Sequence, residues 1–270
     1  MAALGAATFT TVVLVILFVV FRPSRLPVPA PPPEDPAVLL PLPTPSVIAV
    51  IIDDVGHSRA AAAHFLDNDL PIALSFLPGR PHTLELAQEA FDRGKTILLH
   101  LPMEPEGFPG IDPGHGAVLV AQKQGEINRI LKQNLQEVPH AVGLNNHMGS
   151  KATSDTRIMS NVLEFARERS LIFVDSRTSP ETVGYRIARS MGVPALERDV
   201  FLDNSRDLVS MKEKAVELLD LAESRGWAIG IGHPYPETAK ALEWMAEEAG
   251  RRGIRWTTVE EILSYADPGN

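Results

Sequence analysis

Two adjacent carboxylates, Asp53 and Asp54, follow directly on a run of apolar residues. Burial among apolar side chains and repulsion between like charges both disfavour ionised carboxylates, and a bound cation would relieve both costs. Neighbouring side chains of a strand point to opposite faces, although the backbone can turn at a strand end so that both reach one site. Alternatively, Asp54 caps the N-terminus of a following helix. The pair therefore predicts either a metal site or a helix cap.

Three histidines occupy comparable places, each after a short apolar run. His100 follows residues 96–99, His147 lies in the polar stretch 145–150, and His233 follows residues 227–232. Asp175 and Asp203 follow two further apolar runs, 171–174 and 200–202. Each of these residues alone is compatible with a structural, hydrogen-bonded role.

Together they suggest a common site, because the carboxyl ends of parallel strands form the site in α/β folds. Two neutral imidazoles and one carboxylate suit a divalent metal such as zinc and leave coordination positions for water and substrate. The remaining histidines lie in helix or loop patterns and receive no role: His57, His64, His82, His115 and His140.

The apolar runs are short and rich in β-branched residues, which is typical of strands buried on both faces. The predicted strands are 47–52, 72–77, 96–99, 141–144, 171–174, 200–202 and 227–232. Amphipathic segments of helical length are 80–93, 124–136, 156–169, 208–225 and 236–252. This alternation predicts an α/β fold with a parallel sheet and right-handed crossovers. About seven strands fit either a barrel or an open doubly wound sheet.

Composition excludes several classes of function. The chain has no cysteine, so His and carboxylate side chains must hold any metal. A formal net charge of -9 without a basic stripe argues against a nucleic-acid partner. No dinucleotide fingerprint follows the first predicted strand, so we expect no nucleotide cofactor. The G-x-S-x-G motif of serine hydrolases is absent as well.

The N-terminal part of the sequence predicts a tether. Residues 2–21 carry no charge, and about twenty helical residues span a bilayer of roughly 30 Å. We therefore interpret residues 1–22 as a membrane anchor or signal segment, 23–45 as a proline-rich linker and 46–270 as one folded domain. The expected location is the inner membrane, with the domain in the periplasm or another extracytoplasmic space. Arg22 and Arg25 count against this orientation under the positive-inside rule.

At the strand ends the sequence resembles the divergent polysaccharide deacetylase family, which is related to the NodB-homology carbohydrate esterases. The resembling stretches are 51–56, 100–105, 143–153, 174–178, 200–204 and 230–236, and the resemblance covers roughly residues 46–265. It implies a distorted (β/α) barrel of about seven parallel strands with a mononuclear metal site.

The resemblance implies Asp53 as the catalytic base and Asp54 as a metal ligand that acts with two histidines. Better-characterised relatives place both histidines in one H-x-x-x-H segment, whereas here Glu104 stands four residues after His100. We therefore expect His147, from the next strand end, to supply the second imidazole.

Four further residues complete the expected site. His233 is the candidate general acid toward a leaving amine. Asp175 and Asp203 are expected to orient His233 or to bind sugar hydroxyls, and Asn146 is expected to contact the substrate.

These residues predict metal-assisted hydrolysis of an N-acetyl group on an amino-sugar polysaccharide or oligosaccharide of the cell envelope. An alternative is a non-catalytic, envelope-tethered module that retains the pocket to bind a glycan or a protein. A metal-dependent phosphoesterase or amidase would use similar ligands.

Overall fold

The computed structural model describes residues 45–266. The predicted membrane segment 1–22 lies outside the described residues, as does the predicted linker 23–45 apart from its last residue. Within the described part, none of the helices combines the length and the apolar character needed to cross a membrane.

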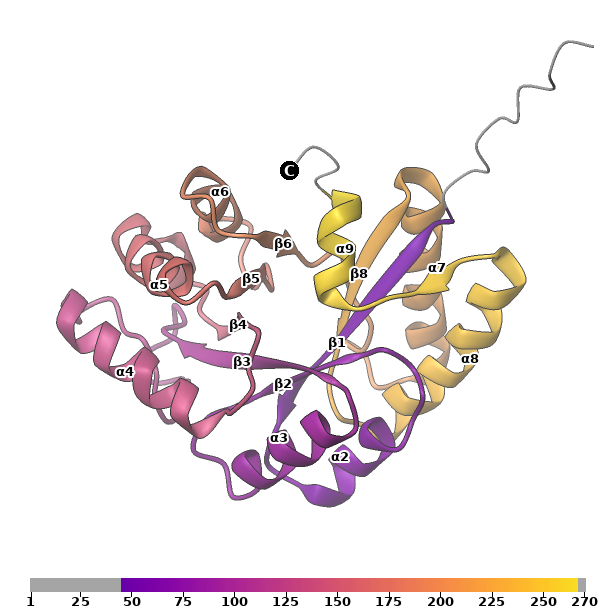
Figure 1. Ribbon diagram of the computed structural model, residues 1–270, viewed down its shortest axis with the longest axis horizontal. Helices are drawn as coiled ribbons and strands as arrows, with labels where there is room; N and C mark the ends of the chain where they lie inside the picture. Colours follow the sequence, from indigo (N-terminus) through magenta and orange to yellow (C-terminus); the bar gives the residue numbers. More distant parts are fainter. Residues whose placement is uncertain (1–44, 267–270) are drawn as a thin grey trace, which may run out of the picture. The chain divides into compact units, whose positions relative to one another are not determined.

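A single parallel sheet organises residues 45–266 (Figure 1). Its nine strands are β1 (Val47–Val55), β2 (Ala73–Phe76), β3 (Thr96–Met103), β4 (Gly143–Met148), β5 (Ile172–Asp175), β6 (Ala195–Glu197), β7 (Val200–Phe201), β8 (Trp227–Gly232) and β9 (Arg255–Trp256). The strand order is β6-β5-β4-β3-β2-β1-β8-β7, and β9 pairs with the first residues of β1. Strands that are consecutive from β1 to β6 are therefore neighbours in the sheet.

Helices alternate with these strands along the chain, except between β6 and β7. They are α2 (Arg59–Leu66), α3 (Thr83–Asp92), α4 (Gln124–Glu137), α5 (Thr156–Glu168), α6 (Gly184–Ser190), α7 (Leu208–Arg225), α8 (Pro236–Arg252) and α9 (Val259–Ala266), with the short 3-10 helix η1 (Ala152–Ser154) after β4. Helices α2 to α8 cover the outer face of the sheet, whereas α9 lies between β6 and β8 on its inner side (Figure 1).

The sheet curls so that its two edges approach one another. Strands β6 and β7 are the opposite edges of the sheet, yet only two residues separate Glu197 from Val200. Three peptide steps reach at most roughly 11 Å, so the edges must lie close together. The arrangement is an incomplete barrel, which confirms the predicted distorted barrel and excludes the open doubly wound sheet.

Two apolar cores hold the curled sheet. The alternation of side chains along β1 sends Ile48, Val50 and Ile52 into the outer core beneath the helices. Val47, Ala49 and Ile51 enter the inner core, which also contains Val259 and Ile262 of α9. Helix α9 thus fills the inside of the curl at the end from which the strands start, and it leaves their carboxyl ends accessible.

All seven predicted strands are present, but β1 extends through Asp53 and Asp54 to Val55, and two further strands also extend beyond their predicted ends. Strand β3 continues through His100 to Met103, and β4 includes Asn145 and His147. The prediction ended both strands at the first polar residue, whereas backbone pairing between β3 and β4 continues past it. The short strands β6 and β9 and the helices α2, α6 and α9 were not predicted.

The alternative role of Asp54 as a helix cap is wrong. Helix α2 begins later, at Arg59, and its N-cap is Ser58, whose hydroxyl accepts a hydrogen bond from the backbone N–H of Ala61. Asp54 is still part of β1.

Candidate metal centre and active site

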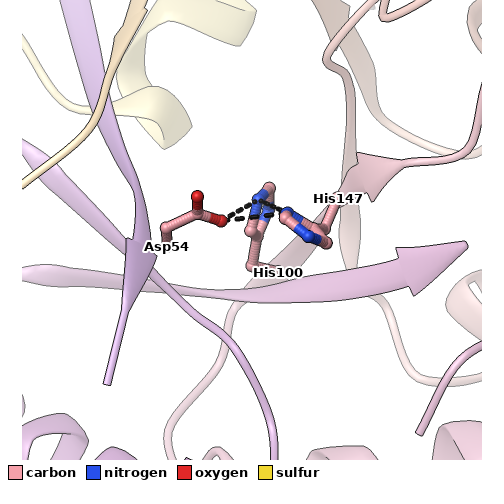
Figure 2. A group of neighbouring side chains, drawn as sticks. All are labelled: Asp54, His100 and His147. Atoms are coloured by element: carbon pink, nitrogen blue, oxygen red, sulfur yellow. Dashed lines mark hydrogen bonds and ion pairs between the residues drawn. The ribbon is translucent and has the colours of Figure 1, made fainter. Parts of the chain in front are cut away.

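Three side chains from three strands converge at the carboxyl end of the sheet. Asp54 Oδ1 lies 3.2 Å from His100 Nε2 and 2.9 Å from His147 Nδ1, and the two imidazole nitrogens are 3.2 Å apart. Figure 2 shows the carboxylate of Asp54 pointing toward both rings. These are the three residues that the sequence predicted as metal ligands.

The register between β3 and β4 explains why the two histidines meet. His100 pairs with Asn145, and Pro102, two residues further along β3, pairs with His147. Side chains two residues apart on a strand share a face. His100, Asn145 and His147 therefore lie on one face of the sheet.

Backbone conformation brings both aspartates to this face. Asp54 has a φ of 57°, in the left-handed region that residues other than glycine rarely adopt. The pairing register between β1 and β2 shifts between Ile52 and Val55. This turn breaks the strict alternation of the strand, so Asp53 and Asp54 both line one pocket.

The donor set fits a divalent cation. Asp54 Oδ1 is buried and has no well-formed hydrogen bond among the described residues, although two imidazole nitrogens lie nearby. His100 Nδ1 is 3.0 Å from Asn145 Oδ1, which can only accept, so Nδ1 carries a proton and Nε2 is the nitrogen that a neutral ring would offer to a cation. Burial alone would raise the pKa of Asp54, but the adjacent imidazoles lower it well below its ordinary value. An anionic oxygen and imidazole nitrogens are suitable ligands for zinc.

Asp53 sits beside this cluster and is almost fully buried, with 2% of its surface exposed. Its Oδ1 accepts a hydrogen bond of 2.8 Å from Asn145 Nδ2, and its Oδ2 lies 3.6 Å from His100 Nε2. Burial raises the pKa of Asp53, and the nearby His100 and Asn145 offset this only in part. A carboxylate with a raised pKa is suited to accept a proton.

His233 faces the cluster from the end of β8. Its Nε2 lies 4.0 Å from Asp54 Oδ2, and its Nδ1 is 2.8 Å from Asp203 Oδ1. Asp203 Oδ2 also accepts hydrogen bonds from the backbone N–H of His233 (2.6 Å) and the hydroxyl of Thr238 (2.7 Å). Burial alone would lower the pKa of His233, but the hydrogen bond and charge of Asp203, with the charges of Asp53 and Asp54, raise it to about 9.

Two aromatic rings lie next to the ring of His233. The rings of Phe201 and His233 stack with centroids 6.2 Å apart, and the ring of Tyr235 lies 5.8 Å away. The guanidinium groups of Arg198 and Arg206 cover Phe201 and Tyr235, respectively. The ring is thus held with Nε2 toward the cluster.

The Asp54, His100 and His147 cluster, Asp53 and His233 all line one cavity of about 410 Å³. Its lining is formed by Asp53, Asp54, His100, Pro105, Ile111, Asn146, His147, Met148, Ser150, Ser176, Thr178, Phe201 and His233. A volume of this size is typical of small-molecule sites.

The profile of the divergent polysaccharide deacetylase family matches residues 50–263. The chain belongs to the divergent polysaccharide deacetylase family. It is 35% identical to the uncharacterized protein YibQ of Escherichia coli K12 over 212 residues, which are 77% of this chain and 66% of that protein. The chain thus spans just under two thirds of the length of this curated relative.

Solved structures agree with this deacetylase-family fold. The structure of an uncharacterized protein from Agrobacterium tumefaciens C58 superposes with a TM-score of 0.77 at 26% identity and covers 81% of this chain and 89% of that one. A CE4 family pseudoenzyme from Bacillus anthracis superposes with a TM-score of 0.51 at 14% identity, covering 82% and 66%. The second likeness is one of fold alone.

In this member of the deacetylase family, Glu104 does not replace the histidine of an H-x-x-x-H segment. Its Oε1 accepts a hydrogen bond from Lys151 Nζ (2.6 Å), and its Oε2 accepts one from the backbone N–H of Val120 (2.5 Å). Glu104 therefore connects the loops that follow β3 and β4. The second imidazole of the cluster comes from His147.

Asn146 lines the pocket, but its side-chain amide forms hydrogen bonds with other groups of the protein. Its Nδ2 donates to the backbone carbonyl of Met148 (2.8 Å) and to Thr178 Oγ1 (3.2 Å), and its Oδ1 accepts from the backbone N–H of Ser176 (2.9 Å). These bonds join the ends of β4 and β5. The geometry assigns Asn146 to the shape of the pocket, and substrate contact by its amide stays a prediction.

The two predicted orienting aspartates lie in different surroundings. Asp203 holds His233, as described above. Asp175 is fully buried, and its carboxylate accepts from the backbone N–H groups of Arg177 and Tyr185 and from the hydroxyl of Thr182. Asp175 therefore organises the segment that leads into α6, and it is not among the described residues that line the pocket.

Asn145 is the residue that sequence reasoning missed. It is fully buried and bonds to both Asp53 and His100. The sequence offered only a polar triplet, Asn145-Asn146-His147, and nothing in it distinguished the two asparagines.

Proposed function

We propose that this protein is a metal-dependent hydrolase that removes N-acetyl groups from an amino sugar. The observation that carries the proposal is the convergence of Asp54 Oδ1, His100 Nε2 and His147 Nδ1, each within 3.2 Å of the others. The buried carboxyl group of Asp53 and the imidazole of His233 flank this cluster. A proton acceptor and a proton donor thus both lie next to one candidate cation site.

The reaction would break the amide C–N bond, form a C–O bond with water, and release acetate and an amine. When bound, a divalent cation such as zinc supplies a Lewis acid that polarises a carbonyl and activates water. Asp53 accepts the proton of the attacking water, because burial raises the pKa of its carboxyl group. His233, with a pKa of about 9, holds a proton at neutral pH and donates it to the leaving nitrogen.

The substrate class in this proposal is a carbohydrate of the cell envelope. Membership of a polysaccharide deacetylase family supports a glycan. The cavity of about 410 Å³ supports recognition of a short or terminal unit.

The proposal includes a location. Residues 1–22 would anchor the protein in the inner membrane, 23–45 would act as a spacer, and the domain would face the periplasm or extracytoplasmic space. The uncharged run 2–21 supports this placement. Protease treatment of spheroplasts should digest the domain while the anchor sediments with membranes. A domain protected until the cells are lysed would contradict the proposed orientation.

The direct test measures acetate release by the full-length chain. The protein is loaded with zinc, cobalt or manganese and incubated with chitin oligosaccharides and peptidoglycan fragments. We expect metal-dependent release that is lost in His147→Ala and retained in His64→Gln, a control that removes an exposed histidine of α2. No acetate with any metal and any of these glycans would contradict the deacetylase proposal.

A second candidate is a non-catalytic module that binds a glycan or a protein through the same pocket. The related fold of the Bacillus anthracis protein, a pseudoenzyme, supports this candidate. Glycan binding that survives chelation, without acetate release, would favour this module over the enzyme.

A further inference from the structure

Asn145 occupies a central position that the proposed reaction does not use directly. Its side chain lies on the same face as His100 and is 0% exposed. It is not among the described residues that line the pocket, so it stands behind the groups that would meet a substrate. Any effect of Asn145 on the site must therefore act through its neighbours.

The amide of Asn145 makes four hydrogen bonds, which is its full capacity. Its Oδ1 accepts from Ser75 Oγ at 2.5 Å and from His100 Nδ1 at 3.0 Å. Its Nδ2 donates to Asp53 Oδ1 at 2.8 Å and to Ser176 Oγ at 3.1 Å. One planar group thus joins a proposed metal ligand to the proposed base.

The direction of these bonds is determined by the partners. An ionised carboxylate can only accept, so the Nδ2 group of Asn145 must face Asp53. The opposite side of the amide is then an oxygen, and His100 Nδ1 must donate to it. A rotated amide would place its oxygen against the Asp53 carboxylate and its N–H groups against His100. The first contact would be repulsive in a buried site, and the second would move the His100 proton to Nε2, the nitrogen that faces Asp54 and His147.

We propose that Asn145 is a positioning residue that keeps His100 protonated on Nδ1, with Nε2 free to bind a metal, and holds Asp53 in place as an acceptor. One amide thereby prepares the ligand and the base together. This inference rests on the proposed function, since it concerns the same metal centre.

Two substitutions test the two parts of this role separately, namely the orientation of His100 and the placement of Asp53. Asn145→Asp keeps an oxygen that accepts from His100, but it places a second carboxyl oxygen against Asp53 Oδ1, so the two carboxyl groups must share a proton. Asn145→Ala removes both contacts. We therefore expect Asn145→Asp to bind Zn²⁺ within about threefold of the wild type, because carboxylates commonly orient metal-binding histidines. Asn145→Ala should bind Zn²⁺ roughly 10- to 100-fold more weakly, the usual cost of losing such a partner.

Both substitutions should lower the rate of acetate release, although only Asn145→Ala should weaken Zn²⁺ binding. Asp53 loses its donor in Asn145→Ala and shares a proton with the new carboxyl group in Asn145→Asp, so kcat for acetate release should fall by about 10²-fold or more in each. In NMR spectra of the Zn²⁺-loaded full-length chain, the protected Nδ1–H proton of His100 should persist in Asn145→Asp and disappear in Asn145→Ala.

Asn134→Ala is the matched control, because Asn134 is also a fully buried asparagine but lies in α4 with its amide on the carbonyl of Gly116. It should lower the melting temperature while Zn²⁺ affinity and kcat stay within about twofold of the wild type. Wild-type Zn²⁺ affinity and an unchanged His100 proton in Asn145→Ala would overturn the inference. So would equal losses of Zn²⁺ affinity in both Asn145 variants.

The outcomes also separate this inference from the proposed function. If the wild type binds Zn²⁺ but releases no acetate, deacetylation fails, while the affinity and NMR results still decide the role of Asn145. If the variants behave alike and the wild type is active, only the role of Asn145 fails. A wild type without Zn²⁺ affinity would overturn both.

Discussion

The ion pair of His233 and Asp203 should make the stability of the metal-free protein depend on pH. The pKa of His233 is about 9 in the folded protein against 6.5 for an ordinary histidine. At about 1.4 kcal/mol per pKa unit, this difference adds about 3 kcal/mol to the free energy of unfolding. Because the folded pKa is the higher one, the contribution is fully present below pH 6.5 and is lost as the pH rises through about 9.

Asp203→Asn should remove most of this contribution, for two reasons. The variant lacks the negative charge, and its amide can satisfy the surrounding groups in one orientation only. The backbone N–H of His233 and the hydroxyl of Thr238 both donate to Oδ2, so the amide oxygen must take that place. The amide N–H₂ then faces His233 Nδ1 and favours a neutral ring protonated on Nε2.

Urea unfolding in the presence of a chelator, followed by tryptophan fluorescence, measures the effect. Between about pH 6 and about pH 9.5 the free energy of unfolding should fall by about 3 kcal/mol more in the wild type than in Asp203→Asn. His64→Gln should follow the wild type, because it removes an exposed histidine of α2. Parallel curves for the wild type and Asp203→Asn would refute the reasoning.

Three further predictions concern individual side chains. His147→Ala should weaken Zn²⁺ binding at least about 100-fold in competition with a chelator, and unchanged affinity would remove His147 from the ligand set. Asp53→Asn should keep Zn²⁺ affinity within about tenfold but lower acetate release about 10²- to 10⁴-fold, and full turnover would contradict its role as base. Glu104→Gln, which breaks the pair with Lys151, should lower the free energy of unfolding by about 1–3 kcal/mol without changing the stoichiometry of bound zinc; loss of zinc would identify Glu104 as a ligand.

The convergence of Asp54, His100 and His147 could be predicted because it depends on topology. Each follows an apolar run and lies in the carboxyl-terminal half of its strand, and the strands are neighbours or near neighbours in a parallel sheet. The carboxyl ends of such strands lie at one edge, so residues far apart in sequence meet there. The prediction therefore needed strand identity and direction but no side-chain detail.

The roles of Asp175 and Asp203 could not be separated in this way. Both follow an apolar strand, and both were expected to act on His233 or on substrate. Asp203 receives hydrogen bonds from His233, thirty residues further along the chain, whereas Asp175 turns to its own loop and to Thr182. The partner of a buried carboxylate is decided by which distant donors the fold brings near it.

The sequence by itself determined the family, the alternation of strands and helices, and the chemistry of the ligands, because apolar periodicity and residue type are local properties. Only the tertiary structure decided which polar side chains face the pocket. The left-handed turn at Asp54 brings both aspartates to one face, and the pairing of β3 with β4 places Asn145 opposite His100. A shift of one residue in a strand moves a side chain to the opposite face, so the orientation of Asn145 and Asn146 became defined only when the strands were paired.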